Sequence, residues 1–259
     1  MELIMVLLLN NHNQFNQLRH RMNPIITVSS VSKHYPDSNQ AQQALDNISF
    51  TLSSGQVLGL LGHNGAGKST LINALLGAHR FSGNITINGL DPIENHAELM
   101  KHLAYISDVN VLPEWMTIKQ ILKYTSGVHP YFDINKALSL ITKTNIKLGS
   151  KIGSLSKGMK VQIHLALVIA TNVKVLILDE PTLGLDLLYR DNFYNDLMAW
   201  FNQGERCLII ASHEVNEIEK LLTDVLILKQ GKCVKLDNMN NIPKGTLADL
   251  FITLQKEAV

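Results

Sequence analysis

One glycine-rich segment of the sequence has the residue types that bind phosphate. Gly62–Thr70 reads GHNGAGKST, directly after the apolar run Val57–Leu61 and before the helical pattern Leu71–Leu76. Glycines let the backbone approach phosphate oxygens, and N–H groups at a helix start supply positive potential. We expect Lys68 to reach the terminal phosphates and the Ser69 hydroxyl to bind Mg²⁺. The residues expected to contact a nucleotide are Gly62, His63, Asn64, Gly65, Ala66, Gly67, Lys68, Ser69 and Thr70. A simple glycine-rich turn before an ordinary helix is the alternative, which the flanking strand and helix disfavour.

Two adjacent carboxylates end a second apolar run. Val175–Leu178 is followed by Asp179 and Glu180. One carboxylate at this place can hold Mg²⁺ while the next polarises an attacking water, and phosphoryl transfer to water needs both functions. We therefore predict Asp179 as a metal ligand and Glu180 as the general base. Two solvated acids at a strand end are the alternative, and the phosphate-binding segment makes that the minor one.

A third apolar run, Cys207–Ala211, ends in Ser212 and His213. Ligands of open α/β sheets bind beyond the carboxyl ends of the strands, so the three strand ends are expected to meet at one crevice. His213 is a candidate for contacting the γ-phosphate and aligning water. An isolated histidine at a strand end is more often an ordinary surface residue, and position alone does not decide between the two.

The sequence predicts a scaffold of alternating strands and helices for these groups. Eight apolar segments have the length of strands: Ile25–Val28, Ile48–Leu52, Val57–Leu61, Ile85–Ile87, Leu103–Ile106, Val175–Leu178, Cys207–Ala211 and Val225–Leu228. Several are continuously apolar, which is typical of parallel strands that helices cover on both faces. Between Val109 and Ala170 helical periodicity replaces the strand pattern and predicts a helical insertion. The predicted fold class is α/β, with a last helix near Thr246–Gln255.

Composition excludes several classes of protein. The chain has 259 residues, 46% hydrophobic and 17% charged, so it can bury a sizeable core. Its 23 basic and 22 acidic residues create no field that would attract nucleic acid, and we expect no nucleic-acid partner. Cys207 and Cys233 lack metal-ligand spacing and are expected to be reduced thiols, as in a cytoplasm.

The apolar run Leu3–Leu9 does not predict a membrane span. It is much shorter than the about 20 residues that cross a bilayer, and Arg19 and Arg21 follow it, whereas a signal peptide has its positive charge first. We treat residues 1–21 as an extension or a start site placed too early. No other stretch reaches about 18 apolar residues, so a transport function would require a separate membrane chain.

Five segments together resemble a known family. They are GHNGAGKST at 62–70, LSKGM at 155–159, LDEPT at 178–182, GLD at 184–186 and SH at 212–213. In this order they resemble the nucleotide-binding domain of ABC transporters, over nearly everything from Ile25 to Leu236. The resemblance implies a P-loop NTPase fold with a mostly parallel core sheet, an antiparallel β-subdomain and an inserted helical subdomain at about 109–170. It assigns residues 22–236 to the ATP-binding domain and 237–259 to a short tail, and implies ATP and Mg²⁺ as cofactors.

The most specific of these segments is the signature Leu155–Met159, which other P-loop ATPases lack. In the family it binds the γ-phosphate of ATP held by the opposite subunit. Ser156 and Gly158 therefore imply a dimer, of two copies or of two different chains, with ATP trapped between the subunits. Tyr35 resembles the aromatic residue that stacks on adenine, and its alternative is a tyrosine that closes a turn. Asp186 resembles the aspartate that links the two sites across the dimer.

The sequence departs from the family pattern at four positions. Asp108 stands where the family usually has a glutamine, so an oxygen ligand for Mg²⁺ is kept on a shorter, charged side chain. Lys157 and Met159 replace a glycine and a glutamine of the signature, and Lys157 either adds charge near the partner's phosphates or points to solvent. His63 stands where a proline is frequent and is expected to shape the loop. Separately, His164 is expected to be a core or rim histidine of an apolar helix.

The resemblance implies an ATP-hydrolysing subunit on the cytoplasmic face of a membrane, driving movement through a separate transmembrane permease. The tail and the signature resemble those of exporters, which is an argument by analogy. One alternative is an ABC-type ATPase that moves a soluble partner; such proteins usually carry tandem domains, coiled coils or basic patches. A second alternative is a nucleotide sensor with weak hydrolysis, which Asp108 and the altered signature leave open.

Overall fold

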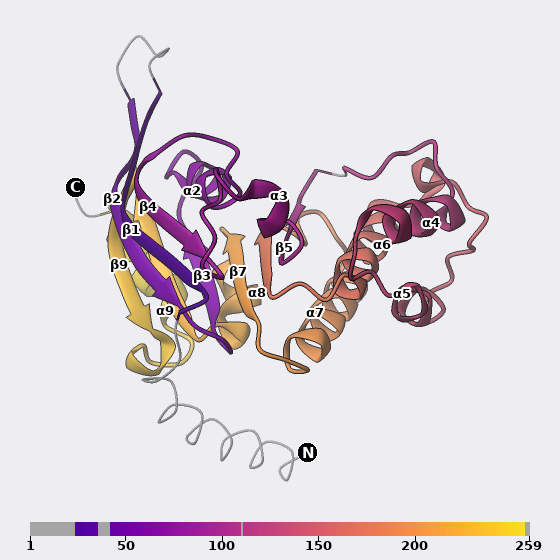
Figure 1. Cartoon of the computed structure of the whole chain (residues 1–259). Coiled ribbons are helices and arrows are strands. Elements are labelled where there is room, and N and C mark those ends of the chain that lie inside the picture. The colour runs from indigo at the N-terminus through magenta and orange to yellow at the C-terminus, as the bar shows by residue number, and fades with distance from the viewer. Residues whose placement is uncertain (1–23, 36–41, 110, 257–259) are drawn as a thin grey trace.

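Five of the predicted apolar runs and one further strand form a six-stranded sheet in the computed structural model, which describes residues 24–35, 42–109 and 111–256 (Figure 1). The strand order is β5-β6-β7-β3-β8-β9. Its strands are β3 (Val57–Leu61), β5 (Leu103–Ser107), β6 (Val175–Asp179), β7 (Cys207–Ser212), β8 (Asp224–Lys229) and β9 (Lys232–Asn238). All neighbouring pairs are parallel except β8 with β9. The expectation for residues 1–21 lies outside the described residues.

Parallel register brings the ends of the strands level. Ser107 pairs with Asp179, Asp179 with Ala211, and Leu61 with Ser212. All residues of β3 and β7 are buried, as expected for strands covered on both faces. The polar residues that follow β3, β6 and β7 therefore emerge at the same edge of the sheet.

A second, antiparallel sheet has the order β2-β1-β4, from β1 (Ile26–Tyr35), β2 (Gln42–Leu52) and β4 (Ser82–Ile87). The helix α2 (Lys68–Leu75) packs between the two sheets. One apolar cluster joins Ile26 and Ile48 of the antiparallel sheet, Leu71 of α2 and Leu60 of β3. The element that carries Lys68 is thus fixed on both sides.

The residues between β5 and β6 are helical, as predicted. They include α4 (Ile118–Val128), α5 (Ile134–Ile141), the short 3-10 helix Ile152–Ser154 and α6 (Lys157–Ala170). Thr117 and Gln120 form a capping box at α4, Asp133 caps α5, and Ser156 caps α6. These caps satisfy N–H groups at the helix starts, which have no partner within the helix itself. The helices and the two sheets together confirm the predicted α/β class, with its mostly parallel core sheet and its antiparallel sheet.

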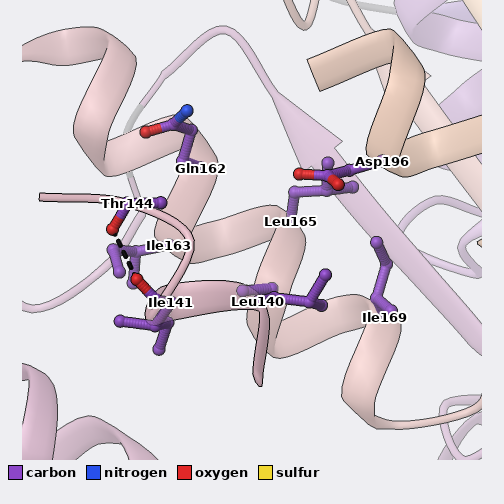
Figure 2. Close-up of a pocket in the computed structure, with 9 residues that line it drawn as sticks. Leu140, Ile141, Thr144, Gln162, Ile163, Leu165, Ile169 and Asp196 are labelled. Carbon is purple, nitrogen blue, oxygen red and sulfur yellow. Dashed lines mark hydrogen bonds between the residues drawn. The ribbon is translucent and has the colours of Figure 1, made fainter. Parts of the chain in front are cut away.

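The helical part packs against α7 (Leu187–Phe201) of the core. A small cavity remains at this junction, between the end of α5, the face of α6 and Asp196 of α7 (Figure 2). Its volume is about 10 Å³, which is room for about one water molecule and not for a nucleotide.

The remaining elements are short or lie near the end of the chain. They are α3 (His96–Leu99), α8 (Val215–Ile218), the 3-10 helices Glu219–Leu221 and Met239–Asn241, and α9 (Leu247–Lys256). The strand β9 was not expected from the sequence, whereas α9 was. Leu247 and Phe251 of α9 are buried in the same apolar cluster as Phe193 and Trp200 of α7. None of the helices in the described ranges is long and apolar enough to cross a membrane.

Candidate functional site

The loop Gly62–Thr70 has the backbone that its glycines predict. A Cβ on Gly62 would lie 2.8 Å from the Ala66 Cβ and 2.9 Å from the Leu228 carbonyl oxygen, so a side chain does not fit there. Gly67 has a φ of 109° and caps α2 without a side-chain hydrogen bond. The N–H groups at the start of α2 therefore have no side-chain cap and point toward the loop, the arrangement that binds anions.

Lys68 is held inside the site. Its side chain is 7% exposed, its ammonium donates to the Gly62 carbonyl, and it lies 3.9 Å from Glu180 Oε1. Burial lowers the pKa of Lys68, and the negative charges of Glu180 and Asp179 oppose this effect. The ammonium is therefore partly desolvated and already faces the two carboxylates.

Asp179 ends β6 beside Tyr105 of β5. The Tyr105 hydroxyl donates to Asp179 Oδ2 over 3.4 Å, and burial raises the pKa of Tyr105 to about 12. Burial also raises the pKa of Asp179, and the charges of Glu180 and Asp108 raise it further, against the effect of Lys68. The exposed Asp108 therefore lies close enough for its charge to act on Asp179, and its role as a metal ligand stays a prediction.

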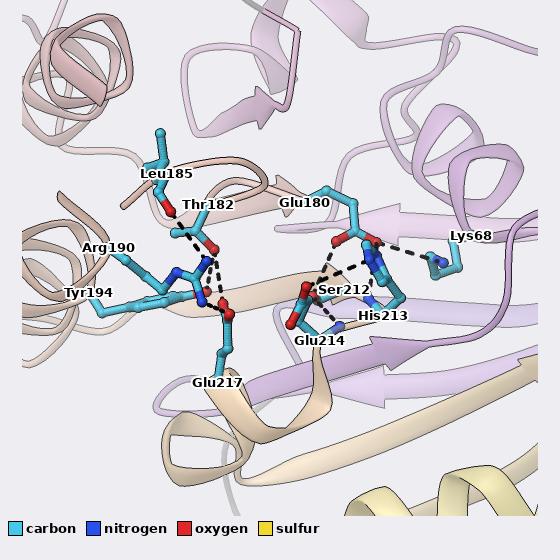
Figure 3. A network of polar contacts seen from close by, with 10 residues as sticks. All are labelled: Lys68, Glu180, Thr182, Leu185, Arg190, Tyr194, Ser212, His213, Glu214 and Glu217. Atoms are coloured by element: carbon cyan, nitrogen blue, oxygen red, sulfur yellow. Dashed lines mark hydrogen bonds and ion pairs between the residues drawn. The ribbon is translucent and has the colours of Figure 1, made fainter. Parts of the chain in front are cut away.

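Glu180 is the centre of a hydrogen-bonded group (Figure 3). Its Oε1 accepts from the His213 backbone N–H over 3.0 Å and lies 2.8 Å from His213 Nδ1. Its Oε2 accepts from the Ser212 hydroxyl over 3.2 Å. Glu180 itself has a φ of 49°, a left-handed conformation that is uncommon outside glycine. Contacts from Ser212, the last residue of β7, and from His213, which follows it, hold both carboxylate oxygens in place.

The donor chemistry of this region fits Mg²⁺. The metal prefers hard oxygen ligands and usually keeps several waters, so one or two carboxylates are enough. Asp179 and Asp108 supply carboxylates, and the pKa of Asp179 is raised first by burial and then by the negative charges of Glu180 and Asp108, which a divalent cation would offset. Among the described residues no group of three or more His, Cys, Asp or Glu could hold a metal by itself.

The signature segment lies away from the P-loop of its own chain. α2 packs on one face of the six-stranded sheet and α6 on the opposite face. Ser156 caps α6 by accepting from the Met159 N–H over 3.3 Å, and both Ser156 and Lys157 are exposed. Gly158 is buried, and a Cβ there would lie 2.6 Å from the ring of Tyr189. Within one chain the signature therefore does not reach the loop Gly62–Thr70.

The other predicted residues lie in varied surroundings. The Tyr35 ring has Lys33 Nζ 5.0 Å from its centre and meets His79 edge to face at 6.1 Å. Asp186 caps α7 by accepting from the Tyr189 N–H over 3.0 Å. These contacts leave the adenine role of Tyr35 and the linking role of Asp186 as predictions.

His63 and two further residues have contacts that the sequence did not suggest. The His63 ring lies 5.4 Å from that of Phe251 in α9. Gln255 of α9 donates over 3.0 Å to the Leu228 carbonyl, the same group that packs on Gly62. Tyr105 was also missed as a partner of Asp179, although it stands two positions before the end of the adjacent strand.

The chain is similar to ATP-binding subunits of transporters. A family model described as ABC transporter matches residues 45–183. An uncharacterized ABC transporter ATP-binding protein of Methanocaldococcus jannaschii, MJ1023, is 30% identical over 229 residues, which cover 85% of this chain and 80% of the relative. A solved ATP-binding subunit of an ABC transporter has a TM-score of 0.81 at 23% identity, covering 90% of this chain and 100% of that one. The dimeric cassette MJ0796 bound to ADP and Pi has a TM-score of 0.72 at 18% identity, covering 83% and 98%.

Proposed function

This chain belongs to the ABC transporter family, and on that premise we propose that the crevice at the ends of β3, β6 and β7 is where it hydrolyses ATP. The chain is an ATP-binding subunit with ATPase activity that serves a transporter. The observation that carries the proposal is the convergence of Lys68, Glu180 and His213, from three different strand ends, on one hydrogen-bonded group. Residues far apart in the sequence thereby meet where phosphoryl transfer needs them.

The loop Gly62–Thr70 would hold the phosphates. Its backbone N–H groups and the start of α2 supply the positive potential, and Lys68 adds a full charge. Ser69, at the exposed first turn of α2, and Asp179 would hold Mg²⁺, with Asp108 near enough to assist. The metal, when bound, neutralises charge on the phosphate oxygens. Tyr35 is proposed as the adenine contact.

Glu180 is proposed as the base that orients and deprotonates the attacking water. Its carboxylate is fixed by Ser212 and by the backbone and ring of His213, so it needs little reorganisation to act. The second ring nitrogen of His213, Nε2, lies 4.0 Å from Glu214 Oε1, and we assign the γ-phosphate contact to this half-exposed ring. Catalysis would thus come from positioning and charge neutralisation, without a covalent intermediate.

The second half of each site would come from another subunit. Ser156 and Lys157 are exposed at the start of α6, and Leu187 and Leu188, next to Asp186, are 74% and 69% exposed. Apolar side chains this exposed are typical of a surface that a partner covers. We propose that these residues face a second nucleotide-binding subunit, and that Ser156 and Gly158 complete its ATP site.

An apolar segment beside Asp108 is proposed as the contact with the permease. Val109, Val111 and Trp115 are 63%, 64% and 70% exposed, between β5 and α4. A membrane protein docked there would hold the chain at the cytoplasmic face and would sense Asp108 directly. The outward direction of transport and the domain limits at 21, 109, 170 and 236 stay predictions.

The proposal is tested by measuring phosphate release from Mg-ATP, with the isolated chain and with membranes that contain its permease. We expect hydrolysis that Glu180→Gln removes, and co-sedimentation with the membranes that Trp115→Ala weakens. Hydrolysis without any membrane association would favour an ABC-type ATPase with a soluble partner. Tight Mg-ATP binding without turnover would favour the nucleotide sensor that Asp108 and Lys157 leave open.

A further inference from the structure

Next to the group around Glu180 lies a second polar cluster, outside the proposed catalytic residues (Figure 3). Arg190 of α7 and Glu217 of α8 form an ion pair, with side chains 23% and 14% exposed. Removing two charges from water costs free energy, so a pair this buried needs further hydrogen bonds to offset that cost. Within the described ranges, the further side-chain hydrogen bonds of the pair go to one turn, residues 182–185.

Both partners of the pair contact this turn. Glu217 Oε2 accepts from the Thr182 hydroxyl over 3.4 Å, and Arg190 Nη2 donates to the Leu185 carbonyl over 3.4 Å. Thr182 is 5% exposed, and its hydroxyl also lies 3.2 Å from the hydroxyl of Tyr194. The turn is therefore held at its beginning and its end by one ion pair.

The two chain segments that the pair joins are the ones that carry the catalytic candidates. Thr182 follows Glu180 by two residues, and Glu217 follows His213 by four. Glu180 and His213 meet at 2.8 Å, and their segments meet again at Glu217. Glu180 also has the unusual φ of 49°, which persists only if its surroundings fix it.

The guanidinium also links the pair to the exposed end of the turn. Its Nη2 donates to the Leu185 carbonyl, and Leu185 directly precedes Asp186 and the exposed Leu187. The pair is therefore connected both to the segment after His213 and to the residues proposed to face the second subunit.

We propose that Arg190 and Glu217 are positioning residues for hydrolysis. The pair holds the turn 182–185 and the segment after His213 so that Glu180 and His213 keep their contact. The turn leads into the surface that faces the second subunit under the proposed function, on which this inference rests. The pair therefore also couples the position of that surface to the position of Glu180. Removing it should lower kcat and leave the affinity for ATP nearly unchanged.

The experiment compares Arg190→Met and Glu217→Gln with Asp196→Asn, which breaks an exposed ion pair on the same helix, Lys143–Asp196 at 3.9 Å. Three quantities are measured: kcat and KM for Mg-ATP, the melting temperature, and the ¹⁵N NMR signal of the His213 ring in the nucleotide-free protein, assigned with His213→Gln. We expect kcat to fall at least about tenfold in both pair variants, KM to change less than about threefold, and the His213 signal to shift. Asp196→Asn should change none of these.

If Arg190→Met does not fold, the double variant Arg190→Glu with Glu217→Arg replaces it in the comparison. This exchange reverses the charges of the pair and should recover part of kcat. An unshifted His213 signal with an unchanged kcat would overturn the inference. The NMR signal does not depend on turnover, so it tests the pair even if the proposed function fails. That failure would appear separately, as a wild-type chain that does not hydrolyse Mg-ATP.

Discussion

Lys68 Nζ lies 3.9 Å from Glu180 Oε1, although 112 residues separate them in the sequence. The parallel pairing of β3 with β7 and of β6 with β7 produces this approach, because it brings all three strand ends to one edge of the sheet. The same sheet therefore positions both the ammonium proposed to bind phosphate and the carboxylate proposed to activate water.

Lys68→Ala should lose most of its affinity for Mg-ATP. The ammonium is buried and faces the site, so the variant loses a charged hydrogen bond worth about 1.5–3 kcal/mol, on the order of 10- to 100-fold in Kd. Isothermal titration with Mg-ATP measures the change, and Lys101→Ala, a half-exposed lysine paired with Glu98, is the control. Equal affinities of Lys68→Ala and the wild type would remove Lys68 from the site.

Gly158→Ala should displace the start of α6. A Cβ at this position would lie 2.6 Å from the Tyr189 ring, far inside contact distance, so either the helix or the ring must move. We expect a lower melting temperature and loss of ATP-dependent dimerisation. Adding Tyr189→Ala makes room for the methyl group and should restore the melting temperature in large part. If Gly158→Ala melts like the wild type, the packing of Tyr189 on Gly158 is wrong.

His63→Ala should weaken ATP binding through the contact with α9. The ring of His63 lies 5.4 Å from Phe251, and pairs of this kind contribute about 0.5–1.5 kcal/mol, which is about two- to tenfold in affinity if the loop shifts. His63→Phe keeps an aromatic ring and should bind ATP like the wild type. The same affinity in both variants would show that the loop does not depend on α9.

The stability of the fold should fall in mild acid because of His164. Burial lowers the pKa of His164 from 6.5 to about 4, so the folded chain keeps this side chain neutral. The unfolded chain takes up the proton first, and stability present above pH 6.5 is lost as the pH falls toward 4. His164 keeps some accessible surface, so the loss should stay below ~3 kcal/mol. Urea unfolding at pH 7.5 and 5 measures it, and His164→Leu should depend less on pH.

The sequence predicted the fold class and most of the strands because their patterns are local. The loop at Gly62 and the pair Asp179–Glu180 are contiguous, so spacing alone reveals them. β9 was missed because Lys232, Lys235 and Asp237 interrupt its apolar residues, as suits an edge strand with one neighbour.

Contacts between distant segments could not be predicted in the same way. The hydrogen bond from Tyr105 to Asp179 depends on β5 lying beside β6. The Arg190–Glu217 pair depends on α7 and α8 both contacting the turn 182–185. Neither pair has a spacing that periodicity detects. The packing of the Tyr189 ring on Gly158 is likewise a tertiary contact. It explains why a glycine stands at this position, in addition to the proposed role of Gly158 at the partner's phosphate.

The most direct test of the account is Glu180→Gln, assayed for phosphate release and for dimer formation in Mg-ATP. The amide keeps the shape of the side chain and can still bond to Ser212, but it cannot accept a proton from water. We predict wild-type affinity for Mg-ATP, hydrolysis reduced at least about 100-fold, and a stable ATP-bound dimer on size exclusion. Hydrolysis by Glu180→Gln at the wild-type rate would contradict the assignment of the base and, with it, the proposed centre of the reaction.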